Sequence, residues 1–102
     1  MKDKILSLLG FAQKSGNLFS GENTCELYIK RNKIKLIIIS EDSSLNSKNK
    51  FINLCNSRNI PYLIFSNKAD LSNAIGKYNR AILGIKDAKF KSKILDLYND
   101  EV

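Results

Sequence analysis

The chain has 102 residues, 43% of them hydrophobic, which suits one compact domain over residues 1–102 and is too little for two conventional ones. Seventeen basic and ten acidic residues give a formal net charge of +7, which favours a polyanionic partner, although a basic surface kept for solubility stays an alternative. The chain has no histidine, which excludes Ser-His-Asp and Cys-His nucleophile systems, and no apolar run approaches the length of a membrane span.

The spacing of apolar residues changes several times along the chain. From Ile5 to Ala12 they recur on one helical face, and Gly16 follows as a stop. Lys35 to Ser40 instead hold a continuous apolar run, which is typical of a strand covered on both faces. In chain order we expect helices over residues 2–14, 22–32, 46–58 and 68–76 and a last helix around 90–98, with strands over 17–20, 35–40, 62–65 and 81–85.

Strands that alternate with helices of about ten residues predict an α/β sandwich with helices on both faces of a central sheet. Cys25 and Cys55 lie on otherwise apolar faces, so we expect two buried thiols and no disulfide. The glycines form neither GxGxxG nor a P-loop, and two cysteines without histidine are a weak metal site. We therefore expect no cofactor and no metal. The N-terminus does not resemble a signal peptide, which predicts a cytoplasmic protein.

The segment from Ser20 to Lys30 is the first candidate binding element. Its helix begins at a polar turn, where the first N–H groups have no intrahelical acceptor and the helix dipole attracts anions. Gly21 permits close approach of the backbone, and the Asn23 amide can both donate to and accept from base edges. An ordinary helix start has the same composition, and that alternative stays open.

A second candidate is the loop from Gly76 to Arg80, which precedes the last strand. Lys77 and Arg80 can hold phosphates while Tyr78 stacks on an unpaired base. The alternative is a solvated turn in which Tyr78 caps the core.

Two acidic residues, Glu41 and Asp42, follow the central strand. They could form a paired-carboxylate site, because α/β sheets place ligands at strand ends. An acidic pair before two serines more commonly fixes a turn by accepting backbone N–H groups, which is the interpretation we favour.

A set of short motifs runs along nearly the entire chain in a specific order. They are Leu8-Leu9-Gly10-Phe11-Ala12, Lys14, Gly16, Ser20-Gly21, Ile34-Lys35-Leu36, Ser40-Glu41-Asp42, Cys55, Ile60-Pro61, Leu71, Ala74-Ile75-Gly76-Lys77 and Arg80. Together they resemble the kink-turn-binding ribosomal proteins of the L7Ae type and, within that family, the small bacterial YlxQ-like proteins.

The resemblance implies a three-layer α/β/α sandwich with a four-stranded mixed sheet, binding to RNA that contains a sharp kink with sheared G·A pairs, and no catalysis. In typical members the second helix begins with Gly-x-Asn-Glu-x-x-Lys. Here Gly21 and Asn23 occupy the glycine and asparagine places. Thr24 stands where many members have glutamate, and Leu27 stands where they have lysine.

We therefore expect a monomeric, non-catalytic protein that binds structured RNA on the ribosome, with ribosomal RNA as the candidate, and that does not act at a membrane. One alternative is a protein-interaction module on the ribosome or the transcription machinery, since Leu27 lies off the apolar stripe of its helix. An enzyme, or the substrate domain of an RNA-modifying enzyme, lacks a catalytic constellation to support it. The expected RNA contacts are Lys14, Gly21, Glu22, Asn23, Thr24, Leu27, Lys30, Lys77, Tyr78 and Arg80.

Overall fold

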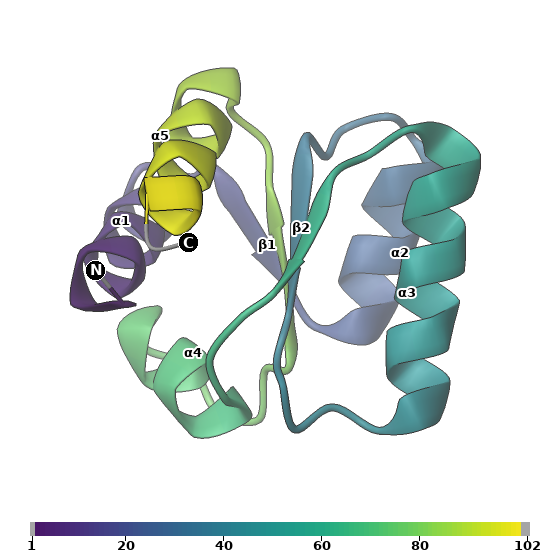
Figure 1. Ribbon diagram of the computed structural model, residues 1–102, viewed down its shortest axis with the longest axis horizontal. Helices are drawn as coiled ribbons and strands as arrows, with labels where there is room; N and C mark the ends of the chain where they lie inside the picture. The colour runs from purple at the N-terminus through teal and green to yellow at the C-terminus, as the bar shows by residue number, and fades with distance from the viewer. Residues whose placement is uncertain (1, 101–102) are drawn as a thin grey trace.

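The computed structural model describes residues 2–100, which fold into three layers. Figure 1 shows α1, α4 and α5 on one face of a four-stranded sheet and α2 and α3 on the other. This is the α/β/α sandwich that the sequence predicts. The helices are α1 (Lys2–Lys14), α2 (Glu22–Lys30), α3 (Leu45–Arg58), α4 (Lys68–Ala74) and α5 (Ala88–Asp100), and the strands are β1 (Leu18–Ser20), β2 (Leu36–Ile39), β3 (Tyr62–Ile64) and β4 (Ile82–Ile85).

The strand order across the sheet is β1-β4-β2-β3, so the last strand of the chain lies between the first two. β4 runs antiparallel to both neighbours, and β2 runs parallel to β3. Leu83 of β4 pairs with Ser20 on one side and with Ile38 on the other. The loop before β4 is therefore held beside the carboxyl ends of β1 and β2.

The sheet separates two apolar clusters because side chains alternate along each strand. Leu36 and Ile38 pack into the cluster on the side of α1, α4 and α5, whereas Ile37 and Ile39 pack on the side of α2 and α3. All four residues of β2 are buried, which confirms the predicted central strand.

The edge strand β3 is less buried than the sequence suggests. The predicted strand over 62–65 contains Leu63 and Phe65, which are buried, but Tyr62 and Ile64 are only half-buried. β3 pairs with β2 on one side and lies at the edge of the described sheet on the other. The apolar run of residues 62–65 looks the same for an edge strand as for a central one, so the sequence did not predict the lower burial.

The predicted helix over 22–32 ends at Lys30. Arg31 is its C-cap, and Asn32 has a φ of 58° in the left-handed region, which asparagine tolerates and which stops the helix.

Both cysteines are free and buried in the cluster beneath α2 and α3, as the sequence predicts. Desolvation raises the pKa of the Cys25 thiol to about 12 and that of Cys55 to about 11. Each sulfur is therefore protonated near neutral pH and serves as packing. No helix within residues 2–100 is long and apolar enough to cross a bilayer.

Gly84 lies in the middle of β4, where its neighbours leave no space for a side chain. A Cβ at this position would lie 2.6 Å from Ile34 Cδ1 and 3.4 Å from Cys25 Sγ. We expect Gly84→Ala to lower the free energy of unfolding by about 1–3 kcal/mol in urea denaturation, because it overpacks this cluster.

The control is Ile34→Val, which removes Cδ1 and alone should cost about 0.5–1.5 kcal/mol. The double variant should then recover part of the loss caused by Gly84→Ala, because the colliding atom is gone. Strictly additive losses would contradict the steric explanation.

Candidate nucleic-acid interface

An open groove of about 650 Å³ lies between the β1–α2 junction and the loop before β4. Its lining residues include the starts of α2 and α4, which lie at the same end of the sheet in Figure 1. The pairing of β4 with β1 brings these two segments together, although they are far apart in the sequence. The groove is lined by Ser20, Gly21, Glu22, Asn23 and Thr24, by Asn79, Arg80 and Ala81, and by Lys68.

Gly21 is the N-cap of α2 and shapes one wall of the groove. Its φ of 96° lies in a region that favours glycine, and its N–H donates to the Ile82 carbonyl at 2.9 Å. No side chain caps the helix, so the first amides of α2 are left for an external partner. Together with the positive end of the helix dipole, these amides suit an anion.

Arg80 forms the opposite wall and is held by several hydrogen bonds. Its Nε donates to Ser20 Oγ at 3.1 Å, and its Nη1 donates to the Tyr78 carbonyl at 2.9 Å. Its backbone N–H donates to the buried Ser72 Oγ at 2.8 Å, and that hydroxyl donates to the Arg80 carbonyl at 3.2 Å. The guanidinium has five N–H donors, so it is fixed in place with donors to spare for a phosphate or a base.

Polar side chains on the first turn of α2 differ in their availability. Glu22 Oε2 accepts a hydrogen bond from Ser47 Oγ of α3 at 2.9 Å, which ties the two helices together. Asn23 is exposed and takes part in none of the side-chain hydrogen bonds found among residues 2–100. Thr24 is half-buried beside it. Asn23 is therefore the side chain most available to a ligand on this turn.

A second hollow of about 540 Å³ adjoins the groove, and Lys68 and Asn79 line both. It extends the surface to Lys77 and Tyr78. The Tyr78 side chain is 90% exposed, so the interpretation in which this ring caps the core is wrong. Asn79 turns the loop with a φ of 59°. The ring thus projects into solvent next to the groove, as a base-stacking platform requires.

Asp42 stabilises the start of α4. Its Oδ1 accepts the Lys68 backbone N–H at 2.9 Å, and this hydrogen bond lowers the pKa of the Asp42 carboxyl below its ordinary value. The Asp42 carboxylate thus accepts a backbone N–H, as in the interpretation that we favoured. The donor, however, lies at the start of α4 and not in the turn that contains Asp42. Glu41 is exposed, and residues 2–100 contain no cluster of three or more metal-ligating side chains.

Comparison with known proteins identifies the family. Residues 3–95 match the ribosomal protein L7Ae/L30e/S12e/Gadd45 family. The chain belongs to this family. It is 32% identical to the RNA-binding protein YlxQ of Bacillus subtilis (strain 168) over 90 residues, which cover 88% of this chain and 90% of that protein.

Two further relatives agree with this assignment. The large ribosomal subunit protein eL8 of Thermoplasma volcanium is 31% identical over 88 residues, covering 85% of this chain and 73% of that protein. A solved structure of a protein with unknown function from Bacillus halodurans C superposes with a TM-score of 0.90 at 35% identity, covering 94% of this chain and 97% of that one.

Not every predicted contact of this L7Ae-family chain lies at the groove. Lys14 is the last residue of α1, and Lys30 is the last residue of α2, at the other end of that helix from Gly21. Lys30 Nζ also pairs with Glu26 Oε2 at 3.1 Å. Leu27 lies one helical turn beyond Asn23 and is 42% exposed.

Four lining residues were not among the predicted contacts, namely Ser20, Lys68, Asn79 and Ala81. Lys68 reaches the groove from the start of α4, and Asn79 reaches it from the loop before β4. The polar start of α4 could have drawn attention to Lys68. That Lys68 lines the same groove as Gly21, however, depends on the strand order, which no local sequence pattern gives. Asn79 sits between two residues that were predicted to bind.

Ser72 holds the loop before β4 in place. We expect Ser72→Ala to lower the free energy of unfolding by about 1–3 kcal/mol, because it leaves the Arg80 N–H and carbonyl without their hydroxyl partner. Urea denaturation measures this loss, and amide hydrogen exchange at Arg80 should accelerate.

The control is Ser57→Ala on α3, an exposed serine whose hydroxyl donates only to the Leu54 carbonyl of its own helix. It should change stability by no more than about 0.5 kcal/mol. Unchanged exchange at Arg80 in Ser72→Ala would show that the loop does not depend on this hydroxyl.

Proposed function

We propose that this protein is a non-catalytic RNA-binding protein that recognises structured, kink-turn-like RNA in the groove between the β1–α2 junction and the loop before β4. The observation that carries the proposal is the composition of that groove. Uncapped helix amides, the exposed Asn23 amide and the fixed Arg80 guanidinium face one surface, beside the exposed Tyr78 ring. Membership of a family that includes a relative named as RNA-binding supports the same assignment.

Each group in the groove suits a different part of an RNA. Arg80, Lys77 and the first amides of α2 suit phosphate oxygens, and Lys68 adds a cation between the two hollows. The Asn23 amide suits a base edge, because it offers two donors and an acceptor. Tyr78 suits an unpaired base that stacks on its ring. Bases become accessible in this way only where an RNA helix is kinked or interrupted, which favours structured RNA over a straight duplex.

Ribosomal RNA is the candidate ligand, because a relative is named as a protein of the large ribosomal subunit. We further propose that the protein acts as a monomer in the cytoplasm, where ribosomes assemble. The groove is built within one chain and needs no second copy to complete it.

Asn23→Ala should reduce the preference for kink-turn RNA over a straight RNA duplex by about 1–3 kcal/mol, the usual cost of a lost bidentate base contact. Filter-binding titrations with both RNAs at several salt concentrations measure this preference. The slope of log K against log salt should stay unchanged, because asparagine carries no charge.

Asn53→Ala is the matched control, since Asn53 is an exposed helical asparagine on α3 outside the groove. It should leave the preference intact. If the unmodified protein binds both RNAs equally at every salt concentration, kink-turn recognition is rejected, whatever the strength of its binding to RNA in general.

A second function, a protein-interaction module, is favoured by the exposed Leu27 side chain. Leu27 occupies the place of a lysine in typical family members and lies on the same side of α2 as Asn23, four residues on. Leu27→Lys should therefore strengthen RNA binding and increase the salt slope by about one unit. If Leu27 contacts a protein on the ribosome, the same variant should sediment less with ribosomes despite its stronger RNA binding.

The control is Leu45→Lys, which makes the same charge change at a leucine that is 72% exposed at the start of α3. An equal gain in RNA affinity from Leu45→Lys would attribute the effect to net charge alone. Unchanged RNA binding and unchanged sedimentation in Leu27→Lys would count against any role of this side chain in binding.

A further inference from the structure

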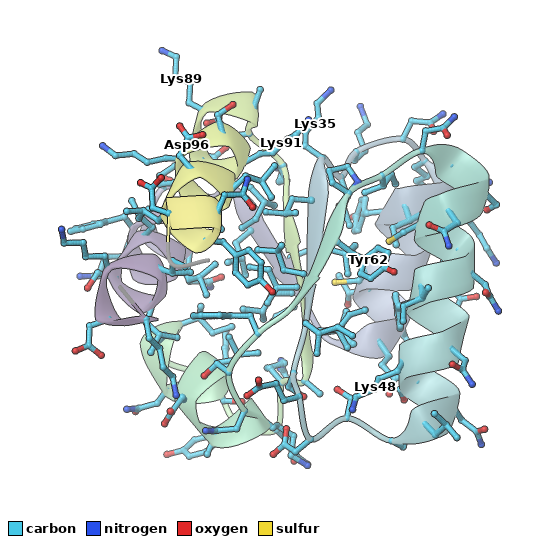
Figure 2. The ribbon with its side chains drawn as sticks, in the orientation of Figure 1. Lys35, Lys48, Tyr62, Lys89, Lys91 and Asp96 are labelled. Carbon is cyan, nitrogen blue, oxygen red and sulfur yellow. The ribbon has the colours of Figure 1, made fainter. Side chains whose placement is uncertain are left out.

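The end of the sheet opposite the groove carries a cluster of cations, which we call the basic end. Figure 2 shows Lys35, Lys89 and Lys91 at this end of the molecule, where α5 begins and β2 starts. Their neighbours come from the end of α2 and the end of β4. The basic end comprises Arg31, Lys33, Lys35, Lys86, Lys89 and Lys91.

The backbone holds two of these lysines next to each other. The Lys35 N–H donates to the Ile85 carbonyl at 2.7 Å, one residue before Lys86, and the Lys86 N–H donates to the Asn17 carbonyl at 2.9 Å. Both side chains are exposed, and none of the ion pairs found within residues 2–100 includes either. Like charges on neighbouring strands repel each other, so this arrangement costs stability unless an anion binds.

Asp87 is the one acid between Lys86 and Lys91, and its charge offsets only one of the six cations of the basic end. Its Oδ2 accepts the backbone N–H groups of Lys89 and Phe90, both at 3.0 Å, so it caps the first turn of α5. None of the ion pairs found within residues 2–100 joins Asp87 to a cation of the basic end, so five of the six positive charges have no acid beside them in this segment.

Two aromatic rings contact cations of the basic end, Lys86 and Arg31. Phe19 of β1 and Tyr28 of α2 stack with ring centroids 4.0 Å apart and an angle of 7° between their planes. Lys86 Nζ lies 5.0 Å from the Phe19 centroid, and Arg31 Cζ lies 5.9 Å from the Tyr28 centroid. These contacts restrict two long side chains that would otherwise lose conformational entropy on binding.

The groove end has no such excess of positive charge. Its cations Lys68, Lys77 and Arg80 lie among the carboxylates of Glu22, Asp42 and Asp70. The basic end therefore has a formal charge of +5, from six cations and Asp87, whereas the charged residues that line the two hollows sum to zero. Arg80 and Lys86 flank β4, six residues apart, which corresponds to about 20 Å of extended chain.

We propose that the basic end is a second RNA-binding surface, which holds the phosphate backbone of an RNA helix separate from the segment in the groove. Lysine and arginine on an exposed surface suit phosphates and carry no base specificity. The protein then bridges two segments of a folded RNA, one recognised by its shape in the groove and one held by charge. This inference rests on RNA as the partner, but not on kink-turn recognition.

The test is the binding of a straight RNA duplex, without a kink, over a series of salt concentrations. The variant Lys35→Gln/Lys86→Gln should bind this duplex more weakly than the unmodified protein, and the slope of log K against log salt should become shallower by about 1.8, or 0.9 for each lost phosphate contact. Its melting temperature should change little, because the repulsion that is removed offsets the cation–π contact that Lys86 loses with Phe19.

Lys4→Gln/Lys48→Gln is the matched control, which removes the same charge from two lysines outside the basic end. It should keep the slope of the unmodified protein. If both double variants give the same slope, the basic end does not hold RNA and the proposal is overturned.

Two further measurements separate this proposal from kink-turn recognition in the groove and from binding of an acidic protein. The ratio of kink-turn affinity to duplex affinity should be the same in Lys35→Gln/Lys86→Gln as in the unmodified protein. Asn23→Ala should instead lower this ratio and leave the salt slope unchanged. The two variants therefore report on different surfaces. Polyglutamate is the second probe. If Lys35→Gln/Lys86→Gln loses polyglutamate binding while duplex binding is unchanged, the surface serves an acidic protein and the RNA proposal is overturned.

Discussion

The antiparallel insertion of β4 between β1 and β2 is the constraint on which the rest of this structure depends. Hydrogen bonds on both sides of the strand fix its register, with the Gly21 N–H on the Ile82 carbonyl and the Ser40 N–H on the Ala81 carbonyl. A slip of one residue would exchange the faces of Ile82 and Leu83, which belong to different apolar clusters. Burial on both faces therefore fixes the position of the loop that carries Arg80.

This register determines how rigid the groove is. Gly21 and Asn79 both have positive φ values, and both line the groove because β1 and β4 are paired. Backbone in such conformations persists only where its surroundings enforce it. Here the buried Ser72 hydroxyl and the Arg80 guanidinium supply hydrogen bonds on the loop side. The donors of the groove are thus set before any ligand arrives, which reduces the entropy lost on binding.

Local patterns predicted the elements well, because helical and extended segments differ in the spacing of their apolar residues. The buried run of β2 and the stripe from Ile5 to Ala12 are found where they were expected. Strand order depends on pairing between segments that are far apart in the chain, and it determines which residues meet at the groove. Lys30 was predicted in the same binding element as Gly21, but nine helical positions separate the two residues by about 13 Å along α2. Lys68 joins the groove because β3 runs parallel to β2, which brings the start of α4 to the end of the sheet where β4 begins.

The distribution of charge differs between the two ends of the sheet. Thr24 lines the groove and Leu27 follows it on α2, and both are uncharged. The cations of the groove are offset by nearby carboxylates, which limits their attraction for a polyanion. If the groove recognises the shape of an RNA, as proposed, its weak attraction for a polyanion calls for positive charge elsewhere on the same molecule. The basic end, where backbone hydrogen bonds hold Lys35 and Lys86 beside β4, would supply that charge without base specificity of its own.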